Sequence, residues 1–288
     1  MTPRFIDLHT HTTASDGSDS PADLVRKATE AGLAAVAVTD HDTVAGLDEA
    51  VAMGHETGIE VVRGCELGVR SEYGEIHILG LWLPEKPETL LDAMKELRRH
   101  RNERNERIVD NLRTLGMDIT YEEVRALSGG VSVGRPHIAL ALLRHGYIRT
   151  PQEAFDRFIG PGAPAYAPKK VFSPAEGVRL LASCGATVAI AHPMLLRCPE
   201  EWLDDTVADL KVAGLDAIEA YHSEHSHKDE RRCVDIADRH GLVLTGGSDY
   251  HGKAKPAISL GRGRGGLRVT THVLDNLKRH RRERGLPV

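Results

Sequence analysis

The sequence has few aromatic residues, few cysteines and no long apolar run. Phe, Trp and Tyr make up 4% of its 288 residues, so the core must be built mainly from Ala, Val, Leu and Ile. So few aromatic rings also make a long stacking track for single-stranded nucleic acid unattractive. The cysteines, Cys65, Cys184, Cys198 and Cys233, form no Cys-x-x-Cys pair. This pattern is typical of reduced cytoplasmic thiols and not of a disulfide framework or a thiolate zinc site.

Membrane and secretion signals are also missing from the sequence. No stretch is long and apolar enough to span a bilayer, and the N-terminal residues lack the basic and apolar regions of a secretory signal. The formal net charge of −5 argues against binding of nucleic acid through bulk charge alone, although a local basic groove is compatible with it. We therefore expect a cytoplasmic protein with no membrane contact and no obligate protein partner.

Short apolar runs alternate with helical stretches in both halves of the chain. Residues 34–38 (AAVAV) read as a parallel strand covered on both faces. Before them, Ser20 or Asp19 can cap a helix that has Pro21 in its first turn and ends before Gly32. Residues 60–62 are a further strand candidate. The same alternation returns between residues 174 and 245, with helices expected at 174–183 and 200–213. It predicts βαβ units, and therefore an α/β fold with a mostly parallel sheet.

The middle of the chain has a different pattern. Residues 84–168 contain few strand signals; they hold a long charged helical stretch, two shorter helices and a loop rich in Gly and Pro. We expect a helical insertion here that caps the mouth of a barrel. The predicted domains are thus a barrel formed by residues 1–83 and 169–288 and a cap formed by residues 84–168.

Histidine and acidic residues gather where the expected strands end. The set comprises Asp7, His9, His11, Asp16, Asp40, His41, Glu66, His77, His192, His222, Asp249 and His251. In an α/β barrel the carboxyl ends of the strands meet on the face where active sites are built. His9 and His11 are two positions apart, so on an extended segment their rings project to the same side.

Each of these residues also has an ordinary structural explanation. His77 could be a satisfied strand residue, Asp40 could cap the next helix, and Glu66 could pair with an arginine. A fold has little structural reason, however, to place costly polar groups at the ends of several separate strands. The set as a whole therefore predicts a metal centre.

Five segments resemble, in order, the motifs of the PHP (polymerase and histidinol phosphatase) superfamily of metal-dependent phosphoesterases. They are DLHTHTTASDG, VTDHDT, GCE, AHP and GSDYH, and they extend from Asp7 to His251. The resemblance implies a distorted (β/α)7 barrel of the PHP type with two or three divalent ions per chain, with Mn²⁺ as the first choice and Zn²⁺ or Fe²⁺ as alternatives. Mixed nitrogen and oxygen ligation without cysteine suits all three metals and does not choose among them.

The resemblance also implies which residues hold these ions. The implied ligand sets are His9, His11, Glu66 and Asp249 for one ion, Glu66, His77 and His192 for a second, and Asp16, His41 and His251 for a third. Asp7 and Asp40 are expected to orient imidazoles from behind the ligands. Some family members have His where this chain has Asp16, which leaves the identity of the third ion open.

Ions at such a centre are expected to hold a bridging hydroxide in line with phosphorus and to neutralise the developing charge. Asp249, His222 and Arg135 are the predicted catalytic residues. His222 could bind an ion, contact phosphate or protonate the leaving oxygen. Arg135, in GRPH, and Lys169 and Lys170, in APKK, are expected to bind substrate phosphate. The alternatives are a helix start for Arg135 and a solvated loop for the lysines.

The resemblance is closest to a subfamily that acts on small nucleotides, the 3′,5′-nucleoside bisphosphate phosphatase and RNase AM-like group. It implies removal of the 3′-phosphate from a nucleoside 3′,5′-bisphosphate, which leaves a 5′-nucleotide such as AMP. The alternatives are a 5′→3′ exoribonuclease acting on short RNA ends, a histidinol-phosphate phosphatase and a non-catalytic metal-binding module. The sequence does not choose between a mononucleotide and an RNA end.

Overall fold

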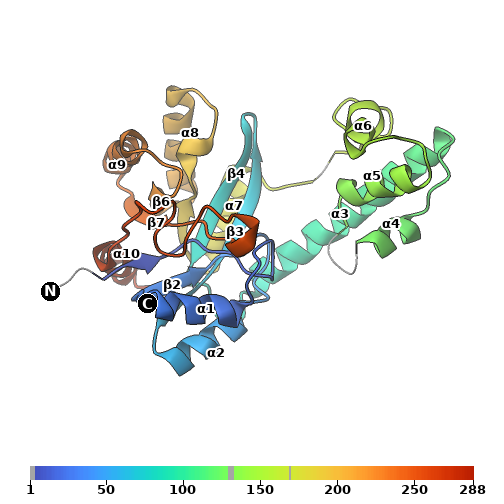
Figure 1. The fold of residues 1–288 in the computed structure, drawn as a ribbon. Coiled ribbons are helices and arrows are strands. Elements are labelled where there is room, and N and C mark those ends of the chain that lie inside the picture. The colour runs from blue at the N-terminus through green and yellow to red at the C-terminus, as the bar shows by residue number, and fades with distance from the viewer. Residues whose placement is uncertain (1–3, 129–132, 169) are drawn as a thin grey trace. The chain divides into compact units, whose positions relative to one another are not determined.

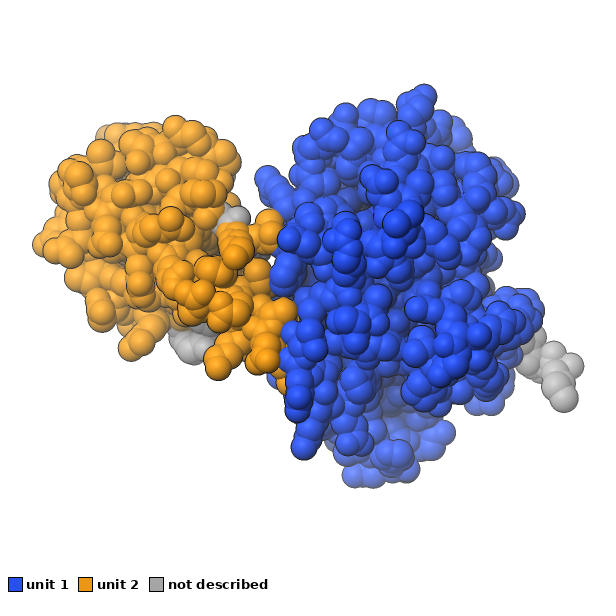
Figure 2. All heavy atoms as spheres, turned by 180° about the vertical axis from the view of Figure 1, so that it is seen from behind, with its two compact units in different colours: residues 1–90, 172–288 blue, residues 91–171 orange. Residues whose placement is uncertain are grey.

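The computed structural model describes residues 4–128, 133–168 and 170–288. The chain divides into two compact units, Met1–Leu90 with Phe172–Val288 and Leu91–Val171 (Figure 2). The sequence analysis placed the boundaries at residues 84 and 168. Helix α3, Glu88–Thr114, begins within the first unit and continues into the second, so the first boundary falls inside a helix, whereas the second, between Val171 and Phe172, falls in a segment without helix or strand.

The first unit contains a seven-stranded sheet whose strands follow the chain order (Figure 1). The strands are β1 Ile6–Asp7, β2 Ala35–Val38, β3 Glu60–Ser71, β4 Gly74–Leu81, β5 Thr187–Ile190, β6 Ala217–His222 and β7 Val243–Gly247. Strand β4 runs antiparallel to β3 and β5, and the other neighbouring pairs are parallel. The amide of Leu8 donates to the carbonyl of Gly246 at 3.2 Å, which brings β1 against β7 and nearly closes the sheet. The predicted α/β barrel is confirmed.

Helices form the outer layer of this barrel. They are α1 Pro21–Glu30, α2 Leu47–Thr57, α7 Pro174–Ser183, α8 Glu200–Ala213, α9 His227–His240 and α10 Thr271–Glu283. Of the two candidate caps for α1, Ser20 caps the helix, because its side chain accepts from the amide of Asp23. Aliphatic side chains of strands β1 to β6, many of them alanine, fill one buried cluster. None of the helices in the described ranges is long and apolar enough to cross a membrane.

The second unit is helical and has a core of its own. After α3 it contains α4 Tyr121–Leu127, α5 Arg135–Arg144, α6 Pro151–Ala154 and a π-helical turn, η1 Phe155–Ile159. Ile108, Leu112, Ile138 and Leu142 are fully buried in its hydrophobic cluster. This apolar stripe on α3 and α5 explains how a charged helical segment can form a compact unit.

Strand β3 is much longer than the sequence predicted. The analysis recognised a strand only at residues 60–62, but β3 continues to Ser71 and pairs with β4 as a hairpin. Glycines and charged residues broke the apolar pattern there. Gly64 is required by close packing, because a Cβ atom would lie 2.9 Å from Thr39 and 3.0 Å from the carbonyl of Gly80. As a result Glu66 and His77 lie within paired strands and not at strand ends.

Candidate metal centre

All nine predicted metal ligands lie in the barrel unit and gather at one place. His9 and His11 follow β1, His41 follows β2, His192 follows β5, and Asp249 follows β7. Four groups have ligand atoms within 4.8 Å of one another: His11, Asp16, His41 and His251; His9, Glu66 and His192; His9, His11 and Asp249; and His41, Glu66 and His77. These groups share members, so they form one cluster that could hold more than one ion.

The fully buried carboxylate of Glu66 lies at the centre of this cluster. Five histidine nitrogens surround it: Nε2 of His9 and of His11 at 3.2 Å and Nδ1 of His41 at 3.1 Å from Oε2, and Nδ1 of His77 at 2.9 Å and Nε2 of His192 at 3.2 Å from Oε1. Burial alone would raise the pKa of Glu66. The charge of His9 and the close ring nitrogens of His11 and His192 outweigh burial and hold this pKa well below its usual value. Glu66 is therefore a carboxylate that can bridge two cations.

The donor atoms of the cluster fit divalent ions. Nε2 of His9, both ring nitrogens of His11, Nδ1 of His77 and Oε2 of Glu66 are buried without a hydrogen-bond partner, although several lie close together. Buried polar atoms are rarely left unpaired, because each unpaired atom loses its hydration. Cations bound among them would accept one ring lone pair from each histidine and a lone pair from Oε2 of Glu66. Nitrogen and carboxylate oxygen without sulfur suit Mn²⁺, Fe²⁺ or Zn²⁺.

Two hydrogen bonds set which nitrogen of a ring faces the cluster. Nδ1 of His9 lies 3.0 Å from Oε1 of Glu219, and Nδ1 of His251 lies 2.9 Å from the backbone oxygen of Asp249. Both oxygens accept, so Nδ1 carries the proton and Nε2 offers its lone pair to a metal. The sequence analysis missed Glu219. A signal was available, since Glu219 is a charged residue between alanines and isoleucine in an otherwise apolar strand.

Among the described residues, Asp7 and Asp40 accept hydrogen bonds from backbone amides and hydroxyls and from no imidazole, which corrects the role expected for them. The amide of His9 donates to Asp7 at 3.4 Å. Asp7 accepts hydrogen bonds from the amide and hydroxyl of Ser248 at 2.8 and 2.5 Å and from the amide of Gly261 at 2.7 Å. Asp40 accepts from the amide and hydroxyl of Thr12, both at 2.7 Å, and from Ser15 Oγ at 2.6 Å. These carboxylates hold the loops that carry the ligands, because loop amides have no strand partner.

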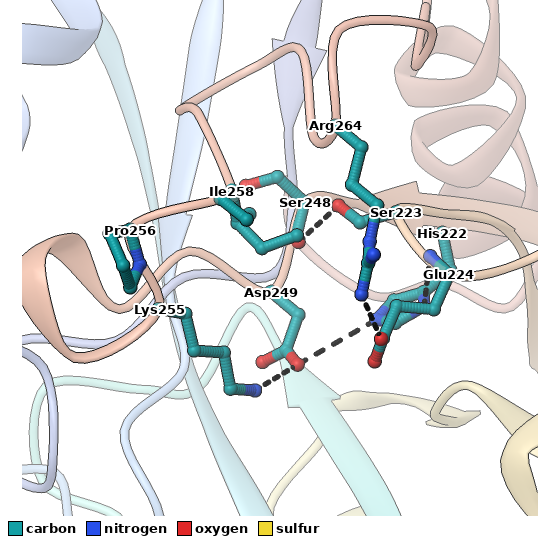
Figure 3. Close-up of a pocket in the computed structure, with 10 residues that line it drawn as sticks. His222, Ser223, Glu224, Ser248, Asp249, Lys255, Pro256, Ile258 and Arg264 are labelled. Atoms are coloured by element: carbon teal, nitrogen blue, oxygen red, sulfur yellow. Dashed lines mark hydrogen bonds and ion pairs between the residues drawn. The ribbon is translucent and has the colours of Figure 1, made fainter.

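His222 differs from the ligand histidines. It is 2% exposed, and its Nδ1 accepts the amide hydrogen of Glu224 at 3.2 Å. The proton of the neutral ring is therefore on Nε2, which has no hydrogen-bond partner and lies 3.7 Å from Oδ2 of Asp249. Figure 3 shows His222 and Asp249 facing each other beside Lys255. Of the alternatives considered, this geometry favours a proton or hydrogen-bond donor over a metal ligand.

The predicted phosphate-binding residues belong to the helical unit. The guanidinium of Arg135 donates to the backbone oxygen of Ile159 at 3.3 Å and lies 5.6 Å from the ring centre of Phe155. Burial lowers the pKa of Arg104 to about 10, and the nearby charges of Arg135 and Arg101 contribute in the same direction. Nζ of exposed Lys170 lies 3.4 Å from His100 Nε2. Lys169 lies outside the described residues.

An α/β barrel with a buried cluster of histidines around a bridging carboxylate defines a metal-dependent hydrolase. The model of the PHP domain family matches residues 7–159. The chain belongs to this family, as the sequence motifs predicted. Its relatives, taken together, identify it as a metal-dependent phosphoesterase of the PHP type.

Several proteins are similar to the chain over nearly its whole length. A 5′-3′ exoribonuclease of Haemophilus influenzae is 33% identical over 87% of this chain and 91% of its own length. A phosphoribosyl 1,2-cyclic phosphate 1,2-diphosphodiesterase of Eggerthella lenta is 33% identical over 86% and 94%. A 3′,5′-nucleoside bisphosphate phosphatase of Chromobacterium violaceum is 29% identical over 89% and 90%. The solved structure of a candidate metal-dependent phosphoesterase from Bifidobacterium adolescentis has a TM-score of 0.69 at 32% identity, over 96% and 97%.

Proposed function

We propose that this phosphoesterase removes the 3′-phosphate of nucleoside 3′,5′-bisphosphates and leaves a 5′-nucleotide such as AMP. The observation that carries the proposal is the cluster around Glu66, where buried nitrogen and oxygen atoms converge without hydrogen-bond partners. A centre of this kind can neutralise the charge of a phosphate group. The 29% identity to the bisphosphate phosphatase of Chromobacterium violaceum supports the choice of substrate.

The cluster would hold two or three divalent ions, with Mn²⁺ as the first choice and Zn²⁺ or Fe²⁺ as alternatives. The proposed ligands are His9, His11, Asp16, His41, Glu66, His77, His192, Asp249 and His251. Ions bound there would supply Lewis acidity to the phosphate and lower the pKa of a water. We assign the ligands to three ions in the three sets that the sequence motifs imply.

We assign the remaining steps to side chains that face the cluster and to the basic residues expected from the sequence to bind phosphate. Asp249 completes the ligand set, because its Oδ1 lies 3.3 Å from Nε2 of His11. His222 donates its Nε2 proton to the phosphate or the leaving oxygen. Arg135, Lys169 and Lys170 bind phosphate oxygens from the helical unit, which serves as a cap over the substrate.

A specific observation also favours a second candidate function. The 33% identity to the exoribonuclease of Haemophilus influenzae supports stepwise hydrolysis from the 5′ end of short RNA. The same metal centre would serve both reactions. The low aromatic content of 4% favours a small nucleotide or a short RNA end over a long single strand.

We place the enzyme in the cytoplasm. All four cysteines are unpaired, and Cys65 and Cys233 are buried. Unpaired thiols persist in a reducing compartment. A nucleotide substrate is available there as well.

Phosphate release from adenosine 3′,5′-bisphosphate with Mn²⁺ tests the proposal, with nucleotide release measured for an RNA oligomer and ring opening for a cyclic phosphate. The comparison substrates are 5′-AMP, histidinol phosphate, a pentose 1,2-cyclic phosphate and a 5′-phosphorylated RNA oligomer. We expect the highest kcat/KM with the bisphosphate and 5′-AMP as the stable product. Preferred degradation of the oligomer would establish the exoribonuclease instead, and preference for histidinol phosphate or the cyclic phosphate would assign those reactions.

A pair of variants identifies the centre that performs the reaction. Glu66→Gln should lower kcat/KM by more than about 100-fold, since loss of a partner behind a ligand already costs roughly 10- to 100-fold. Glu56→Gln, at an exposed position on α2, should match the wild type. Metal-loaded wild-type protein that hydrolyses none of these substrates would support a non-catalytic metal-binding module and contradict the proposal.

A further inference from the structure

A second feature of the barrel unit is a pocket beside the metal centre, formed by the segments that follow β6 and β7. Its volume is about 200 Å³, and its lining includes His222, Glu224, Asp249, Lys255 and Arg264 (Figure 3). Pockets that enclose a complete drug-sized ligand usually have roughly 300–1,000 Å³. This pocket is therefore suited to one group of a larger substrate.

Asp249 separates the pocket from the cluster. Its Oδ1 faces the ligands and lies 3.3 Å from Nε2 of His11, whereas its Oδ2 faces the pocket and lies 2.6 Å from Nζ of Lys255. Only the carboxylate of Asp249 would thus lie between a group bound in the pocket and a phosphate bound at the cluster. The pocket and the reaction centre adjoin each other.

The hydrogen-bond donors of the pocket match an anion. Nε2 of His222 is buried, carries the ring proton by the tautomer argument above, and has no hydrogen-bond partner, with Oδ2 of Asp249 at 3.7 Å. Lys255 and Arg264 bring two cations, with side chains 43% and 60% exposed. Arg264 is paired with Glu224 at 2.6 Å, but such partly exposed pairs contribute only about 0–1 kcal/mol. A phosphate group can therefore replace Glu224 as the partner of Arg264 and form stronger charge-assisted hydrogen bonds with its guanidinium.

We propose that Lys255, Arg264 and Nε2 of His222 form a subsite for a second phosphate group of the substrate, the one that is not hydrolysed. The proposal rests on the phosphoesterase function argued above and specifies how the substrate is chosen. In a nucleoside bisphosphate this group is the 5′-phosphate, and in RNA it is a neighbouring phosphodiester. Such a subsite would make a doubly phosphorylated nucleotide a better substrate than a singly phosphorylated one.

Matched substitutions within one loop test the subsite. Lys255→Met and Arg264→Met remove the proposed contacts, while Lys253→Met and Arg262→Met remove exposed charges from the same segment without changing the lining of the pocket. Kinetics are measured on adenosine 3′,5′-bisphosphate, on adenosine 3′-monophosphate and on a 5′-phosphorylated RNA oligomer. Calorimetric binding of 5′-AMP provides a readout that is independent of turnover.

With the bisphosphate, Lys255→Met and Arg264→Met should lower kcat/KM about 10- to 100-fold, mainly through KM, as for loss of a charge-assisted contact. They should weaken 5′-AMP binding similarly and change the 3′-monophosphate reaction less than about twofold.

A loss with the oligomer alone would support the subsite and assign it to a phosphodiester. Equal losses on all substrates would assign Lys255 to positioning Asp249 and overturn the proposal, as would losses no larger than those of the controls. Wild-type protein that is inactive on every phosphate ester would contradict the proposed function. Wild-type protein that binds 5′-AMP no more tightly than the Lys255→Met variant would contradict the subsite.

Discussion

Nδ1 of His9 lies 3.0 Å from Oε1 of Glu219, although 210 positions separate the two residues in the chain. Glu219 also accepts the amide hydrogen of His192 at 2.8 Å. One buried carboxylate on β6 therefore sets the tautomer of His9, which follows β1, and fixes the backbone of His192, which follows β5. Glu219 thus orients two of the proposed metal ligands.

Glu219→Gln should weaken metal binding while preserving the fold. The amide can still accept from His9, but the negative charge that makes the imidazole a strong ligand is lost. We expect Mn²⁺ affinity to fall about 10- to 100-fold, as measured by metal titration. Glu56→Gln, on the exposed face of α2, should leave the affinity unchanged. Equal affinities for both variants would show that the carboxylate of Glu219 is not needed.

Gly247→Ala should disturb the ligand segment through backbone contact. A Cβ atom on Gly247 would lie 2.3 Å from the amide nitrogen of His9 and 2.4 Å from its Cβ, so β7 and the His9 segment would have to separate. Overpacking of this kind costs about 1–3 kcal/mol, measured as the free energy of unfolding in denaturant. Gly266→Ala has open space around its Cβ and should cost little. A stable, fully active Gly247→Ala protein would contradict the packing described here.

Asp7→Asn should destabilise the loops that hold the centre. Asp7 accepts from three backbone amides and one hydroxyl, and an amide side chain would turn an NH₂ group towards at least one of these donors. A buried donor left unpaired costs about 1–3 kcal/mol, again measured by denaturant unfolding. Asp205→Asn, at an exposed position on α8, should unfold like the wild type. A variant at Asp7 that is as stable as this control would show that the loop does not depend on the carboxylate.

Metal removal should lower the thermal stability of the protein. A ligand bound only to the folded state adds about 2.7 kcal/mol when it is present at 100 times its Kd. We therefore expect Tm to rise when Mn²⁺ is added to chelator-treated protein and to return to its lower value after a second chelation, in a scanning fluorimetry experiment. His9→Ala should reduce the Mn²⁺-dependent rise, whereas His55→Ala, at an exposed position, should retain it. A rise of the same size in both variants would place the bound ion elsewhere.

Local patterns were sufficient to predict most elements of the barrel unit. Helix α7, Pro174–Ser183, and helix α8, Glu200–Ala213, were predicted at the observed residues, because caps and apolar periodicity are local signals. The outer half of β3 was not predicted. The pairing of this part of β3 with β4 depends on the close approach of neighbouring strands to Gly64. Glycine does not contribute to an apolar pattern, so the sequence carried no strand signal there.

The sequence by itself determined the fold class and the kinds of ligand atom, since strand periodicity and the order of the His and Asp motifs are written along the chain. Only the tertiary structure decided which groups share a volume. It placed Glu219 behind His9, assigned Asp7 and Asp40 to loop backbones, and set Lys255 against Asp249. The physical reason is that these contacts form when a nearly closed sheet brings distant strand ends together, and the partner of a buried charge is set by that closure and not by its neighbours in the chain.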